Sequence, residues 1–122
     1  MAETMPNVEG TAGSLIVQVE GDIHIDAALV SRSVYVTGYK STAEPEDLMI
    51  HFMKRKNGGG NIDSIVISKR GAAVITFDSP EDVKTVLQKK QELEGAALNV
   101  KPYEEIMKTD NHSLVVRLRA FL

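Results

Sequence analysis

The chain contains the same structural unit twice, and this repeat constrains the fold more than any other feature of the sequence. Each unit has a short apolar run, a Pro-Glu-Asp triplet and a segment with helical spacing, which continues to Lys56 and to Lys90. Proline suits the first helical position because its missing N–H would have no partner inside the helix, and acidic residues there face the positive end of the helix dipole. Two helices are therefore predicted to begin near Pro45 and Pro80.

A strand candidate stands on each side of both helices, which gives the order βαββαβ. The four candidates are Ser33–Thr37, Ile62–Ser68, Ala72–Phe77 and Ala97–Lys101. Right-handed crossovers place both helices on one face of such a sheet. The predicted fold class is therefore α+β, a ferredoxin-like sandwich of a four-stranded antiparallel sheet with two helices on one face. The other face is expected to be bare.

The alternation of strand side chains predicts which residues lie on that bare face, because successive side chains point to opposite sides of a sheet. In the first strand, Tyr35 is expected to point away from the helices, between Val34 and Val36 in the core. In the third strand, the residues expected in the core are Ala73, Ile75 and Phe77, and those on the bare face are Ala72, Val74 and Thr76.

These strands resemble those of the RNA-recognition motif (RRM). Arg70–Phe77 fits the frame of the RRM octamer, but Ala72 and Val74 stand where that motif has outward aromatic residues. Val34–Tyr39 resembles the companion hexamer and keeps its outward aromatic residue, Tyr35. The resemblance covers the chain from Arg32 to Tyr103 and implies the RRM fold.

A narrower resemblance concerns Ile50–Asp63, where a helix with a basic end is followed by three glycines and a strand. This segment is similar to the atypical RRM repeats of the N-myc and STAT interactor and interferon-induced protein family, and of macrodomain-containing ADP-ribosyltransferases. The resemblance implies a non-catalytic module that mediates protein association in interferon-linked signalling, often as one repeat of several.

RNA binding or single-stranded DNA binding is the alternative function. Base stacking on aromatic side chains is worth roughly 1–3 kcal/mol per base, so the two missing aromatics remove roughly 2–6 kcal/mol. The net charge of −3 and the pI of about 5.6 also argue against a generic nucleic-acid binder. We therefore expect at most weak RNA binding, for which the candidate residues are Tyr35, Tyr39, Lys69, Arg70 and Thr76.

The three glycines are not a phosphate-binding loop. Such a loop follows a strand and opens a helix, whereas Gly58, Gly59 and Gly60 follow a helix and open a strand. A helix cap with a linker is the favoured interpretation, because glycine readily adopts the left-handed conformation of a C-cap. Contact with a protein partner is the alternative.

Two flanking segments lie outside the RRM frame and read as strands with one apolar face. The first is Leu15–Glu20, and the second is Ser113–Arg119, whose apolar residues are Leu114, Val116 and Leu118. We expect these strands to extend the sheet or to pair with another chain. Alternatively, the first belongs to a preceding repeat and the second is the start of a following repeat. The predicted organisation is a disordered segment at 1–14, a flanking strand and linker at 15–31, the RRM-like domain at 32–103 and a C-terminal extension at 104–122.

Other function classes lack the residues that they need. The chain has no cysteine, and no histidine stands with a nucleophile or with a ligand cluster at a recognisable spacing. We therefore expect no catalytic residue, no metal and no cofactor. No apolar run reaches the roughly 18–20 residues of a membrane span. A cytoplasmic protein is expected, with the nucleus as the alternative, and its expected partner is a protein or a second copy of itself.

Overall fold

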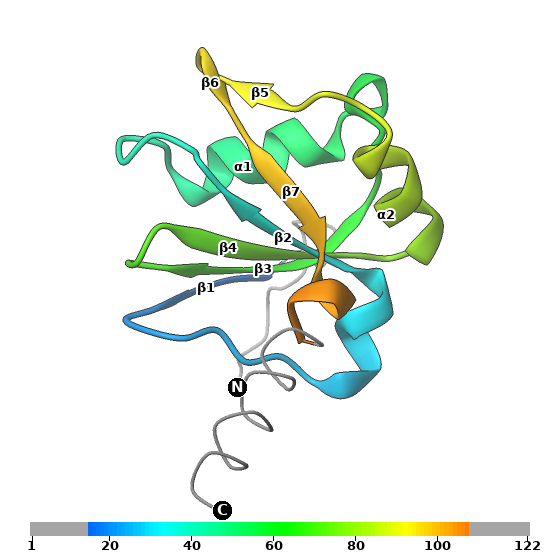
Figure 1. Cartoon of the computed structure of the whole chain (residues 1–122), viewed down its shortest axis with the longest axis horizontal. Helices are drawn as coiled ribbons and strands as arrows, with labels where there is room; N and C mark the ends of the chain where they lie inside the picture. The colour runs from blue at the N-terminus through cyan, green and yellow to red at the C-terminus, as the bar shows by residue number, and fades with distance from the viewer. Residues whose placement is uncertain (1–14, 108–122) are drawn as a thin grey trace, which may run out of the picture.

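The two repeated units form the strands and helices that their sequences predict. In the computed structural model, which describes residues 15–107, the first unit forms β2 (Ser33–Thr37), α1 (Pro45–Met53) and β3 (Ile62–Ser68). The second unit forms β4 (Ala72–Phe77), α2 (Pro80–Leu87) and β7 (Asn99–Pro102). Both helices begin at their proline, as predicted. The helices α1 and α2 lie on the same side of the sheet (Figure 1).

The sheet has five strands in the order β1-β3-β4-β2-β7. The strands β3, β4, β2 and β7 are antiparallel to their neighbours and make up the predicted four-stranded sheet. The fifth strand, β1 (Leu15–Val19), pairs in parallel with β3 and forms one edge. The prediction that the first flanking segment extends the sheet is therefore confirmed.

Both helices end three residues earlier than their spacing predicts. After Met53 the chain turns extended at Lys54, and a 3-10 turn, η3 (Arg55–Asn57), follows. Gly58 then takes a left-handed conformation, with φ of 87°, and turns the chain towards β3. At the end of α2, the side-chain amide of Gln91 donates a hydrogen bond of 2.9 Å to the carbonyl of Val86. The same carbonyl accepts from the backbone N–H of Lys89 at 3.2 Å, so two donors satisfy it at the end of the helix.

The last strand begins at Asn99, two residues later than predicted, because the residues before it form a small hairpin. Its strands are β5 (Glu92–Leu93) and β6 (Ala96–Ala97). Glu94 and Gly95 between them both have positive φ, 53° and 83°. Such a pair of residues is typical of the tight type I′ turn that joins two antiparallel strands.

The core lies between the sheet and the two helices. Phe52 of α1 and Phe77 of β4 are fully buried, and their rings meet edge to face with centroids 6.5 Å apart. Met53 and Leu87, the last residues of α1 and α2, are 39% and 37% exposed. The other fully buried residues of the core cluster are Val34, Val36, Leu48, Ile65, Ala73, Ile75 and Val86.

The three glycines pack against both helices. Gly58, Gly59 and Gly60 are all buried, and a Cβ atom on Gly59 would overlap the carbonyl oxygen of Phe52. The carbonyl of Gly58 accepts a hydrogen bond from the hydroxyl of Thr85 on α2. Close backbone approach therefore explains why a single cap glycine is not enough at this position.

Candidate functional site

One row of side chains crosses all five strands on the sheet face away from the helices. The strand register pairs Val17 with Val66, Val66 with Val74, and Val74 with Tyr35, and Tyr35 lies next to Lys101 of β7. Paired residues share a face of a sheet, and the neighbours of Tyr35 in β2 are core residues. The predicted outward direction of Tyr35 and Val74 is therefore correct.

The prediction that this face is bare is wrong. Val74 and Thr76 are 0% and 1% exposed, and Ala72 is 8% exposed. The chain itself covers the face from both ends: the segment between β1 and β2 and the helical residues 103–107 run across it (Figure 1). We call these two segments, residues 20–32 and 103–107, the cover.

Tyr103 joins the two parts of the cover to the sheet. Its ring stacks on that of Tyr35, with centroids 6.3 Å apart and an interplanar angle of 28°. Its hydroxyl donates a hydrogen bond of 3.2 Å to the carbonyl of Ile23. Arg32 of η2 (Ala27–Arg32) adds a bond of 2.7 Å to the carbonyl of Phe77 at the end of β4. The resemblance to the RRM implies that a base stacks on the ring of Tyr35. In this structure the ring of Tyr103, from the same chain, stacks there instead.

The two basic candidates lie in the turn between β3 and β4, and each faces an acid from the cover. The ammonium of Lys69 lies 3.0 Å from the carboxylate of Glu20, and the guanidinium of Arg70 lies 3.0 Å from that of Asp22. All four side chains are largely exposed, so each pair is worth at most about 1 kcal/mol. These pairs nevertheless offset the two positive charges of this turn.

Thr76 is buried and is not available as a site residue on this face. Its hydroxyl lies 2.7 Å from that of Ser33 on the neighbouring strand, and the hydroxyl of Ser33 also donates to the carbonyl of Leu29. The Ser33 proton is therefore used by Leu29, which leaves Thr76 to donate to Ser33. These bonds hold η2 against the sheet.

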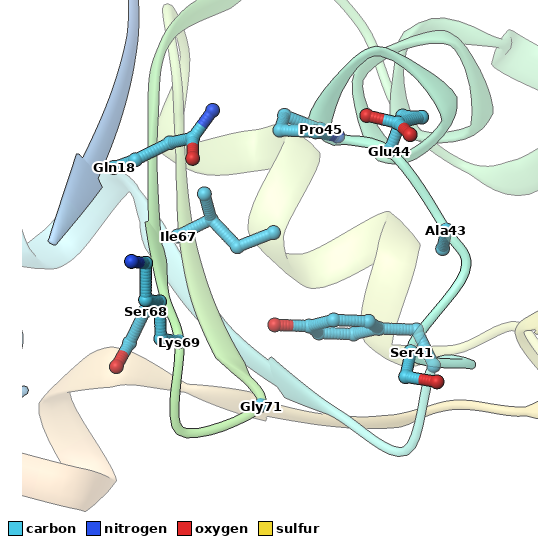
Figure 2. Close-up of a pocket in the computed structure, with 10 residues that line it drawn as sticks. Gln18, Ser41, Ala43, Glu44, Pro45, Ile67, Ser68, Lys69 and Gly71 are labelled. Carbon is cyan, nitrogen blue, oxygen red and sulfur yellow. The ribbon is translucent and has the colours of Figure 1, made fainter. Parts of the chain in front are cut away.

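Tyr39 lies on the other side of the sheet, apart from Tyr35. It packs against the core and lines a cavity of about 550 Å³, together with Gln18, Ile67 and Pro45. Figure 2 shows Ile67 and Gln18 directed from the sheet towards Pro45, at the start of α1. The Tyr39 hydroxyl is buried, and no group among the described residues hydrogen-bonds it. Burial, with a smaller contribution from Tyr35, raises the pKa of Tyr39 to about 12.

The glycines are also poorly placed for a partner. Because Gly58, Gly59 and Gly60 are buried between the two helices, they lack the exposed surface that a contact would need. The C-terminal candidates Leu114, Val116 and Leu118 lie outside the described residues, and their role in assembly stays a prediction.

The strand β1 carries two exposed apolar side chains. Leu15 is 59% exposed and Val17 is 36% exposed, both on the face of the sheet that the cover crosses. β1 has a hydrogen-bonded neighbour in the sheet, β3, on one side, and its other side is the edge. Within residues 15–107 no strand pairs with this edge, so it can add a further strand.

A buried polar network was not predicted from the sequence. The Nε2 of His51 lies 2.7 Å from the Oε1 of Gln91, and the amide nitrogen of Gln91 donates to the carbonyls of Asn57 and Val86. Because that amide is the donor in both bonds, His51 donates through Nε2. The partners are 34 and 40 residues apart, so no local pattern signals them. The network fixes the ends of α1 and α2 to each other.

Neither a metal site nor a membrane span appears in the part of the chain that the structure describes. Within residues 15–107 no group of three His, Cys, Asp or Glu side chains could hold a metal ion. Over the same residues, every helix is too short or too polar to cross a membrane.

Comparisons with a family model and with solved structures both give matches. The family model for the third RRM domain of PARP14 matches residues 31–110. Among solved structures, the RNA binding domain of Hrp1 in complex with RNA is similar, with a TM-score of 0.51 and 20% sequence identity. That match covers 59% of this chain and 45% of the Hrp1 chain, and at this identity it supports the fold alone. No curated protein matches the chain.

The matched family and the geometry agree. The order β3-β4-β2-β7 is that of an RRM sheet, and residues 31–110 contain all four of these strands and both helices. The family match extends over about two thirds of the chain. The chain therefore belongs to the RRM family, in the group of the third RRM domain of PARP14.

Proposed function

We propose that this RRM domain is a non-catalytic module for protein association, and that its sheet face does not read nucleic acid. The observation that carries the proposal is the closed sheet face, on which Val74 is fully buried. RRM domains hold RNA by stacking bases on aromatic residues of the exposed sheet. Here two of those aromatics are replaced by Ala72 and Val74, and the third, Tyr35, is stacked on Tyr103.

The charges support the same proposal. Phosphate binding draws its free energy from basic residues that displace counterions. Lys69 and Arg70, beside the sheet face, are already paired with Glu20 and Asp22. A nucleic acid would have to break these pairs in a chain whose formal net charge is −3.

Association is supported by the open edge of the sheet. An unpaired strand edge is a ready template for a strand of another protein, and main-chain hydrogen bonds then supply the affinity. On β1, the exposed Leu15 and Val17 add apolar contacts to those bonds. No comparable apolar exposure lies on β7, whose residues are Asn99, Val100, Lys101 and Pro102.

RNA binding is the second candidate function, and one observation favours it. Tyr35 is half-buried rather than fully buried, and the exposed Lys101 lies beside it in the sheet. A base could reach Tyr35 if Tyr103 moved away. The similarity to the RNA binding domain of Hrp1 is in keeping with this candidate.

A titration of labelled single-stranded RNA separates the two functions. The parent chain and the variants Tyr35→Ala and Tyr103→Ala are compared at low and at physiological salt, with circular dichroism to verify folding. We expect the parent to bind weaker than micromolar at physiological salt. Sub-micromolar binding by the parent that Tyr35→Ala abolishes would overturn the proposal. Binding that appears only in Tyr103→Ala would show that the cover, rather than the missing aromatics, closes the face.

A further inference from the structure

The strand β1 lacks the features that usually protect a sheet edge. Edge strands avoid uncontrolled pairing through charged residues, proline or a bulge. β1 reads Leu-Ile-Val-Gln-Val, with no charge and no proline, and its pairing with β3 runs from Leu15 to Val19 without a shift in register. At the opposite edge, β7 carries Lys101 and Pro102. Protection is therefore present at one edge and missing at the other.

On the sheet face away from the helices, the apolar side chains of β1 are arranged symmetrically about its centre. Leu15, Val17 and Val19 share the face of the sheet that carries Val66, whereas Ile16 and Gln18 share the helix face. Val17 is the middle residue of the five. Rotating the strand by half a turn about Val17 exchanges Leu15 with Val19, so each position on this face again holds an apolar residue. On the helix face the same rotation exchanges Ile16 with Gln18.

We propose, on the basis of the protein-association function above, that the strand which pairs with β1 is β1 of a second copy of this chain, antiparallel and centred on Val17. In this register Val17 lies opposite Val17 of the second copy, and Leu15 lies opposite Val19. The apolar residues of both copies then form one continuous row on the same face. The two sheets become one sheet of ten strands.

The charges next to β1 favour the antiparallel arrangement. Glu20 follows the strand directly, three residues after Val17. In the antiparallel register the two Glu20 residues are six positions apart along the strands, about 20 Å at roughly 3.4 Å per residue. This exceeds the screening length of about 8 Å at physiological salt, so their repulsion is negligible. A parallel pairing in register would instead bring the two carboxylates together.

The small size of this interface determines how tightly the two copies bind. A pair of five-residue strands buries far less than the roughly 1,200–2,000 Å² of a stable protein interface. The dimer is therefore weak and depends on concentration, and it is detected by cross-linking and by sedimentation over a concentration series.

Single cysteines test the register, because the chain has none of its own. Residues opposite each other in an antiparallel pair have Cα atoms about 4.5–5.5 Å apart, within the range of about 4.4–6.8 Å that a disulfide spans. We expect Val17→Cys to form disulfide-linked dimers many times faster than Glu104→Cys, an exposed control on the cover. A mixture of Leu15→Cys and Val19→Cys chains is expected to cross-link faster than either variant alone.

Sedimentation of the full chain tests the dimer without a cross-link. We expect the parent to dimerise with rising concentration and Val17→Lys to stay monomeric with an unchanged melting temperature, because the side chain is partly exposed. A parent that stays monomeric, with Val17→Cys no faster than Glu104→Cys, would overturn the dimer. If Val116→Lys abolishes the dimer and Val17→Lys does not, pairing through β1 is wrong and the C-terminal segment mediates the association. Either result would leave the proposed function intact, because the RNA titration is the experiment that tests that function.

Discussion

Phe52 provides the most direct test of how this core is held together. Its side chain is fully buried, and its ring meets Phe77 and His51 edge to face, with centroids 6.5 and 4.7 Å away. Replacing a buried phenylalanine by alanine costs about 3–5 kcal/mol. A domain of this size has a total stability of about 5–15 kcal/mol. We therefore expect Phe52→Ala to lose about a fifth or more of the free energy of unfolding.

The neighbouring residue provides a matched control. Met53 follows Phe52 in α1 and is also a large apolar residue, but it is 39% exposed. We expect Met53→Ala to cost less than about 1 kcal/mol, since surface substitutions have small effects. Urea unfolding of both variants, followed by circular dichroism, measures the difference. Equal losses in the two variants would refute the assignment of the helix face, and so would a Phe52→Ala variant as stable as the parent.

Three further predictions follow from packing and burial. Gly59→Ala places a Cβ atom on the carbonyl of Phe52 and should cost roughly 1–3 kcal/mol in urea unfolding. Gly21→Ala is the control, because its Cβ atom would contact only the side chain of Arg70, at an ordinary distance, and it should be neutral. If both variants lost the same stability, the packing argument would be wrong. Val74→Phe should lower the melting temperature rather than create an RNA site, because Val74 is fully buried; tight RNA binding by a stable variant would disprove this. Burial raises the pKa of Tyr39 from 10.0 to about 12, so the unfolded chain loses this proton first and stability should fall between those pH values. Tyr39→Phe should reduce this loss of stability at high pH. At neutral pH its stability should equal or exceed that of the parent, because the variant lacks the buried hydroxyl that has no hydrogen-bond partner among the described residues. A pH profile of stability identical to that of the parent would contradict the prediction.

The sequence by itself determined the strands and the points at which the helices begin. β2, β3 and β4 have the bounds that alternation predicts, and α1 and α2 begin at Pro45 and Pro80. These features depend on side-chain periodicity and on the fixed φ of proline, which act within a few residues. The order βαββαβ is compatible with few topologies, and the ferredoxin-like fold was predicted correctly from it.

Tertiary structure alone decided what surrounds the sheet. Alternation placed Tyr35 and Val74 on the outer face, but it could not show that Tyr103, 68 positions along the chain from Tyr35, would close that face. The parallel pairing of β1 with β3 and the bond between His51 and Gln91 likewise join residues that are far apart in sequence. A local pattern records which side of a strand is apolar, whereas the partner that covers this side depends on where the rest of the chain folds.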